Sequence, residues 1–150
     1  MIVDIPDDEP VVHLISRGHP PPLLLRHNSS VTALTVPEPA PPVGLGALSA
    51  VPYVPVTFPF ARGDRLVLYT DGVSETRDRD GAFYPLAERV TAWVDQAPAD
   101  LVRSLTDDLA AYAATPSNDD MALVVIERDK TPPLTAGKSR EVHVWDRRGG

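Results

Sequence analysis

Two groups of aspartates each lie next to a stretch of residues that is typical of a buried β-strand. The run Leu66–Thr70 ends at Asp71, and the run Met121–Ile126 begins directly after Asp119 and Asp120. A rigid strand end can hold a functional group in a fixed position. Two strands that each carry a carboxylate at one end can bring these carboxylates together at one sheet edge. Paired carboxylates suit Mg²⁺ or Mn²⁺, which take oxygen ligands and keep several waters.

Each group of aspartates also has a purely structural interpretation. Asp71 and Gly72 form a common turn dipeptide, in which the glycine lets the backbone bend sharply. Asp119 and Asp120 are equally compatible with a solvated turn. Residue type and spacing alone leave both interpretations open.

The composition limits the class of protein. A chain of 150 residues suits one domain that can bury a core. It has no cysteine, which excludes disulfides and thiolate metal sites. We find neither a signal peptide nor an apolar stretch of about 18 residues, so we expect no membrane span and a cytoplasmic location. The net charge of −7 argues against nucleic-acid binding.

The order of expected elements favours an α+β fold of mostly antiparallel sheets. Two consecutive helices are expected to begin at Pro85 and Pro98 and to precede the strand after Asp120. Strands are also expected before these helices, at 11–17, 22–26, 31–36, 53–60 and 65–71. The first two look like a hairpin, and two internal prolines make 53–60 an edge strand. Strands and helices do not alternate, so we do not expect a doubly wound parallel sheet.

Other polar residues are assigned structural roles. We interpret His13 as a sheet residue and His19, which follows a glycine and precedes three prolines, as a loop residue and not a catalyst. The acidic residues near the N-terminus are expected to lie in a short loop; they are Asp4, Asp7, Asp8 and Glu9.

Four motifs, taken together in their order and spacing, resemble one protein family. They are GHPPPLL at 18–24, PVGL at 42–45, GDRLVLYTDGVSE at 63–75 and DDMALVV at 119–125. They resemble the SpoIIE-like branch of the metal-dependent, PPM-type protein serine/threonine phosphatases. The resemblance extends over roughly residues 10–128.

The resemblance implies a fold, a site and an activity. The fold is an α-β-β-α sandwich of two antiparallel sheets with helices on both outer faces. By resemblance, Asp71 is a metal ligand beside the backbone of Gly72, Asp119 is the ligand of the final Asp-Asp motif, and Asp120 is its neighbour. Two Mn²⁺ or Mg²⁺ ions are implied in the complete domain. The implied substrate is a phosphoserine or phosphothreonine on a signalling regulator such as an anti-sigma-factor antagonist.

The chain also departs from the family pattern. The family's Gly-Gly-Asp motif, and its second aspartate near a Gly-His-Gly turn, have no counterpart before Val11. We therefore expect residues 1–129 to be the C-terminal portion of the catalytic domain, incomplete on its N-terminal side, and 130–150 to be a flexible tail. An incomplete sheet leaves exposed edges through which the chain can self-associate.

The missing motifs leave two further hypotheses open. The chain can be a non-catalytic remnant or protein-interaction module, which predicts only weak binding of divalent ions. It can also be a domain whose missing half comes from another chain.

Overall fold

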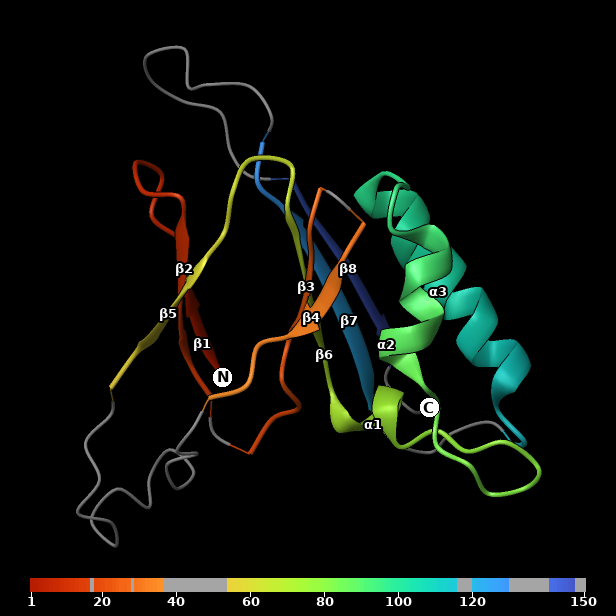
Figure 1. Cartoon of the computed structure of the whole chain (residues 1–150). Coiled ribbons are helices and arrows are strands. Elements are labelled where there is room, and N and C mark those ends of the chain that lie inside the picture. The colour runs from red at the N-terminus through yellow and green to blue at the C-terminus, as the bar shows by residue number, and fades with distance from the viewer. Residues whose placement is uncertain (17, 28, 37–53, 116–119, 130–140, 148–150) are drawn as a thin grey trace, which may run out of the picture.

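The structure consists of two antiparallel sheets and one layer of helices. It is a computed structural model that describes residues 1–16, 18–27, 29–36, 54–115 and 120–129, and the backbone of 141–147. In Figure 1 a three-stranded sheet lies on the left, a five-stranded sheet lies in the middle, and the helices α2 and α3 lie on the right. This arrangement confirms the α+β class with mostly antiparallel sheets.

The three-stranded sheet has the order β1–β2–β5. Its strands are β1 (Ile2–Asp4), β2 (Val11–Ile15) and β5 (Val56–Pro59). Residues of β2 alternate between the two faces, and Val12 and Leu14 are fully buried. The strand β5 lies at an edge, as its prolines predicted. Asp4 belongs to β1, so the expected acidic loop is wrong at this residue.

The five-stranded sheet has the order β4–β3–β6–β7–β8. Its strands are β3 (Leu23–Leu25), β4 (Val31–Ala33), β6 (Arg65–Tyr69), β7 (Met121–Glu127) and β8 (Glu141–Arg147). The central strand β6 is buried on both faces, as expected: Leu66 packs between the two sheets and Val67 packs against the helices.

The expected hairpin between the strands at 11–17 and 22–26 is wrong, because β2 and β3 belong to different sheets. All three residues of β3 are buried, whereas β2 alternates. A strand with no exposed side needs cover on both faces, and the five-stranded sheet, placed between the other sheet and the helices, provides it (Figure 1).

The expected flexible tail at 130–150 is wrong for residues 141–147. These residues form β8, which pairs with β7 along its whole length, from Met121 opposite Arg147 to Glu127 opposite Glu141. The expectation was based on the threonines, prolines, glycines and mixed charges from Lys130 onward, and that composition does not show that 141–147 can pair with the preceding strand, β7. The remainder of 130–150 lies outside the described residues.

The helices cover the five-stranded sheet on the side away from the other sheet (Figure 1). They are α1 (Asp71–Ser74), α2 (Leu86–Arg89), which continues as a 3₁₀ helix (Val90–Trp93), and α3 (Pro98–Tyr112). Both expected helices are present, the first as a short α-helix that continues as the 3₁₀ helix and the second as α3. Proline at the start of α3 has the φ angle that a first helical turn needs. No helix in the described residues has the length and apolar character of a membrane span.

Two apolar cores hold these layers together. The core between the sheets contains Ile5, Val12, Leu14, Leu24, Leu34, Phe60 and Leu66. The core between sheet and helices includes Leu101, Leu105 and Leu109 of α3, which pack with Val67, Leu123 and Val125. In the described residues no helix covers the outer face of the three-stranded sheet, and Ile2 is 56% exposed. The described chain therefore shows one of the two helical layers that the resemblance implies.

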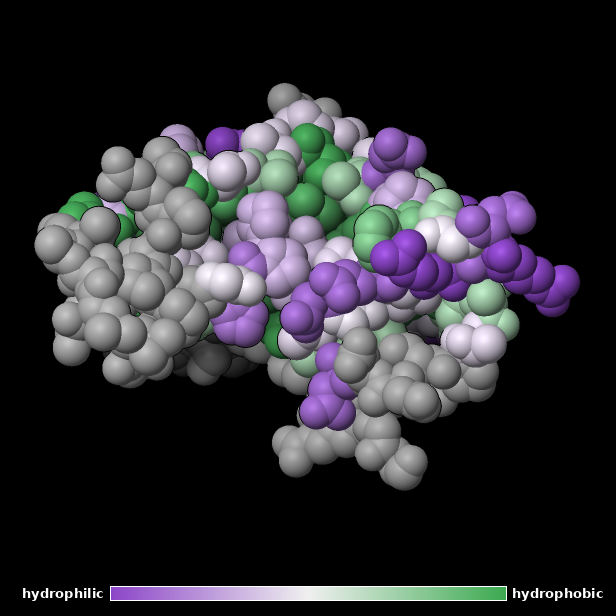
Figure 2. Space-filling view, turned by 90° about the horizontal axis from the view of Figure 1, so that it is seen from below, coloured by the Kyte–Doolittle hydropathy of each residue, from purple (hydrophilic) through white to green (hydrophobic). Residues whose placement is uncertain are grey.

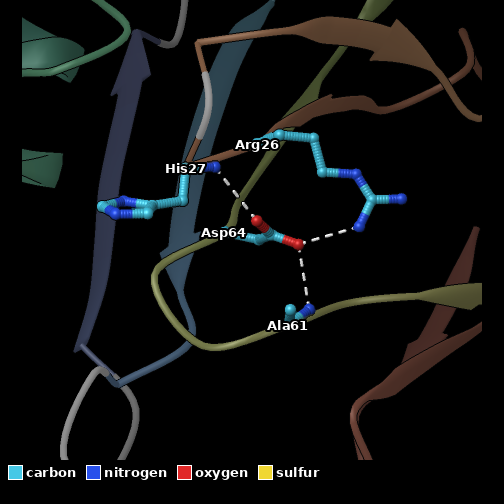
Figure 3. A network of polar contacts seen from close by, with 4 residues as sticks. All are labelled: Arg26, His27, Ala61 and Asp64. Atoms are coloured by element: carbon cyan, nitrogen blue, oxygen red, sulfur yellow. Dashed lines mark hydrogen bonds and ion pairs between the residues drawn. The ribbon is translucent and has the colours of Figure 1, made fainter.

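A buried carboxylate fixes the turn that leads into β6. Asp64 is only 2% exposed. Its carboxylate accepts hydrogen bonds from the backbone N–H of Ala61 (2.9 Å) and of His27 (3.1 Å), and from the guanidinium of Arg26 (3.0 Å). Figure 3 shows that these donors come from two separate turns, one after β3 and one before β6. Asp64 thus ties the start of β6 to the end of β3.

We expect Asp64→Ala to lower the free energy of unfolding by about 3 kcal/mol, because it leaves two backbone donors and a guanidinium without their acceptor in a partly buried site. Urea unfolding measures this loss as a lower midpoint with an unchanged slope.

Asp100→Ala is the matched control. Asp100 pairs with Arg103 at 2.9 Å, but both side chains are more than half exposed. Its loss should cost less than about 1 kcal/mol. Equal losses in the two variants would contradict the anchoring role of Asp64.

Candidate functional site

The antiparallel pair β6 and β7 brings two aspartates to the same end of the five-stranded sheet. Tyr69 is paired with Leu123, and the next residue, Thr70, donates its backbone N–H to the carbonyl of Ala122 at 3.1 Å. Asp71 then follows the end of β6, and Asp120 precedes the start of β7. In Figure 1 this end of the sheet is the lower one, where α1 lies beside the start of β7.

Asp71 is held by its position as the first residue of α1. Its carboxylate oxygen Oδ1 accepts the backbone N–H of Gly72 at 3.1 Å, and its carbonyl accepts the N–H of Glu75 at 2.7 Å. Gly72 and Val73 are buried, whereas Asp71 is exposed. The carboxylate is therefore fixed at its base and accessible to solvent, which suits a metal ligand.

The second acidic group is described only in part. Asp120 is exposed, and its carbonyl accepts the hydroxyl of Thr70 at 3.1 Å. Asp119, together with the proline- and glycine-rich motif at 42–45, lies outside the described residues. The geometry thus brings together Asp71 and Asp120, two of the three candidate ligands.

These residues fit part of a site for a hard divalent cation. Mg²⁺ is commonly bound by one or two carboxylates with water completing its coordination. Asp71 and Asp120 supply donors of that type from a rigid sheet edge. Among the described residues, no group of three histidine or acidic side chains is arranged to hold a metal ion. Water or further ligands would have to complete the coordination.

The loop that follows α1 is anchored on α3. The hydroxyl of Tyr84 donates to the carboxylate of Asp108 at 2.7 Å, and Arg89 binds the other oxygen of the same carboxylate at 3.1 Å. Tyr84 packs edge-on against Tyr112 with ring centroids 5.2 Å apart. Burial, and then the bond to Asp108, raise the pKa of Tyr84 far above its ordinary value, so its hydroxyl remains a donor.

An open pocket of about 430 Å³ lies beside this anchor. Asp78, Asp80, Arg79 and Arg89 are among its lining residues. Asp78 is a loop former: its carboxylate accepts the N–H groups of Asp80 and Ala82, both at 2.9 Å. These bonds, that of Ala82 first, lower the pKa of Asp78. Figure 2, which views the molecule from below, shows hydrophilic residues gathered where this loop projects.

Sequence reasoning missed the residues that connect the site to the fold. Asp64 and Thr70 enter the sequence analysis only as members of the motif at 63–75, and Tyr84 and Asp108 do not enter it at all. Thr70 directly follows the last residue of β6, where a polar side chain is common. The sequence does not show which residue on another strand its hydroxyl binds. Asp108 stands in a helix among other polar residues, which gives no local signal of its bond to Tyr84.

Comparison with known proteins identifies the family. No curated protein and no solved structure gives a match. The family described as Stage II sporulation protein E (SpoIIE) matches residues 1–129, which is most of the chain. The matched region contains both strands of the β6–β7 pair and the aspartates at their ends. The chain therefore belongs to the SpoIIE family, a family of PPM-type phosphatase domains.

Proposed function

We propose that this chain serves in the metal-dependent hydrolysis of a phosphate monoester on phosphoserine or phosphothreonine. The observation that carries the proposal is the β6–β7 pair, which brings Asp71 and Asp120 to one sheet edge in a chain of the SpoIIE family. Asp119, which the resemblance makes the ligand of the final Asp-Asp motif, is proposed as a ligand with Asp71, and Asp120 is the weaker candidate beside it. Anti-sigma-factor antagonists are the proposed substrate class and the cytoplasm is the proposed location, both from the family resemblance.

Electrostatics explains why this site needs a cation. A phosphate monoester is negatively charged, and exposed carboxylates at a sheet edge repel it. Bound Mn²⁺ or Mg²⁺, two ions in the proposed site, would supply an activated water and positive charge for the phosphoryl oxygens. Asp71 and Asp119, with the neighbouring Asp120 as the weaker candidate, would hold the ions, and the N–H of Gly72 would orient the Asp71 carboxylate. No cysteine nucleophile is required, and the chain has none.

We expect Asp71→Asn to reduce Mn²⁺-dependent hydrolysis of p-nitrophenyl phosphate by about 100-fold or more, because even the loss of a residue that only orients a metal ligand costs about 10- to 100-fold. EDTA should abolish the activity and added Mn²⁺ should restore it. The measurement is the initial rate of the purified chain over a series of Mn²⁺ concentrations.

Asp107→Asn is the matched control. Asp107 is also an exposed aspartate, but it lies on α3. The substitution changes the net charge by the same amount and should leave the rate unchanged. A folded wild-type chain that hydrolyses neither p-nitrophenyl phosphate nor a phosphoserine protein with Mn²⁺ present would contradict the proposed activity.

A non-catalytic interaction module is the second candidate function. The observation that favours it is that no helix in the described residues covers the outer face of the three-stranded sheet. Ile2 of β1 is 56% exposed, and Val54, just before β5, is 65% exposed. Such apolar groups suit contact with another protein or with a second copy of the chain.

If this surface mediates self-association, the wild-type chain should elute as a dimer or larger species. Ile2→Lys should shift the chain toward the monomer, because burying an unpaired lysine charge in the interface is costly. Size-exclusion chromatography with light scattering measures the mass. A wild-type chain that stays monomeric at high concentration would contradict self-association. Tight Mn²⁺ binding that is lost in Asp71→Asn would count against a purely non-catalytic role.

A further inference from the structure

The hydroxyl of Thr70 forms its hydrogen bonds outside the helix that Thr70 precedes. Thr70 is the N-cap residue of α1, with φ −87° and ψ 163°. Threonine at an N-cap commonly accepts a hydrogen bond from the first turn of its own helix. Thr70 makes no such bond. Its hydroxyl instead contacts the backbone of β7 and of the residue before it.

The hydroxyl takes the place of a missing rung in the β6–β7 ladder. In a regular antiparallel pair, the carbonyl of Thr70 would accept the N–H of Ala122. That carbonyl has turned into α1, where it accepts the N–H of Val73 at 3.0 Å. The N–H of Ala122 donates to the Thr70 hydroxyl oxygen instead, at 3.0 Å. The ladder thus continues by one residue beyond the point where the backbone of β6 leaves it.

The same hydroxyl also holds the residue that carries the second carboxylate. It donates its proton to the carbonyl of Asp120 at 3.1 Å. With the backbone bond from Thr70 N–H to Ala122, three hydrogen bonds join Thr70 to residues 120–122. Thr70 is covalently attached to Asp71. A single residue therefore ties the backbone of one aspartate to the backbone of the other.

A second hydroxyl supports this arrangement from the other side of α1. Thr76 is 7% exposed, and its hydroxyl donates to the carbonyl of Gly72 at 2.8 Å. It also lies 3.8 Å from the sulfur of Met121, the first residue of β7. Hydrogen bonds within the segment from Asp71 to Thr76 thus stabilise it, and Thr76 contacts the first residue of β7.

We propose that Thr70 is a positioning residue for a divalent-cation site: its hydroxyl fixes Asp120 relative to Asp71, so that both carboxylates can bind Mn²⁺ or Mg²⁺ together. This inference rests on the proposed function. The role requires one group that accepts and donates at once, which the hydroxyl of threonine or serine provides. Valine has the same shape but would leave both the N–H of Ala122 and the carbonyl of Asp120 without their partner.

The test compares Thr70→Val with Thr70→Ser in the full chain, by Mn²⁺ titration and by amide hydrogen exchange. We expect Thr70→Val to weaken Mn²⁺ binding by about tenfold or more, the usual effect of losing a group that orients a metal ligand. The Ala122 amide should exchange faster, while that of Val124 in mid-strand stays protected. Thr70→Ser keeps the hydroxyl and should bind Mn²⁺ within about threefold of the wild type.

Thr57→Val is the matched control for a lost cross-strand hydroxyl. Thr57 lies on β5 in the other sheet, and its hydroxyl is 2.8 Å from the ring of His13. This variant should bind Mn²⁺ as the wild type does. If Thr70→Val does not fold, as circular dichroism would show, Thr70→Ala removes the hydroxyl with a smaller side chain, and the same titration applies.

The outcomes separate this inference from the proposed function. A wild-type chain that binds Mn²⁺, with equal affinity in folded Thr70→Val, would overturn the role of Thr70 and leave the proposed function standing. Weakened binding in Thr70→Ser as large as that in Thr70→Val would also overturn it, because the hydroxyl would not be the cause. A wild-type chain that binds no Mn²⁺ would overturn the proposed metal site itself, and the positioning role with it.

Discussion

The antiparallel pairing of β6 with β7 is the interaction on which the rest of the structure depends. It places Leu66 opposite Ile126 and Val67 opposite Val125 at the centre of the five-stranded sheet. The two faces of β6 contribute to different cores, one toward the other sheet and one toward the helices. Because side chains alternate along a strand, a slip of one residue would exchange these faces. The same slip would move the end of β6, and the acidic site with it, relative to β7.

Polar groups secure this pairing at both ends of β6. At its start, Asp64 binds the turn after β3, and the buried Arg65 bonds to Glu127 at 3.2 Å and to the carbonyl of Val94 beyond the 3₁₀ helix. At its end, the hydroxyl of Thr70 bonds to the start of β7. Apolar packing fixes which face of the strand is buried, but it has no directional preference of its own. Directional hydrogen bonds fix the register, and buried charges that lose a partner are costly.

The acidic end of the sheet combines a rigid backbone with exposed carboxylates. Burying Asp71 or Asp120 would require charged partners from the protein, which would compete with a cation. Leaving them in solvent keeps them accessible, while the backbone beneath them is held by hydrogen bonds. This division of roles is what a metal-dependent phosphatase domain needs, and it agrees with the membership of the chain in the SpoIIE family. The anchor of Tyr84 on Asp108 extends the same rigidity to the loop after α1.

Residue types, spacing and motifs in the sequence predicted the α+β fold class, the family and most of the helices and strands. Apolar runs, prolines and helical spacing predicted β6, β7, the edge strand β5 and both helices that follow Phe83, because these signals are local. Only the tertiary structure decided which strands pair. It assigned β2 and β3 to different sheets, since a strand's partner is chosen by the whole core. It also paired residues 141–147 with the open edge of β7, which the composition of 130–150 did not indicate. The aspartates were visible as residue types from the start. Asp71 and Asp120 lie at the same end of the sheet and are joined through Thr70. This placement depends on the register of β6 against β7, which no local sequence pattern shows.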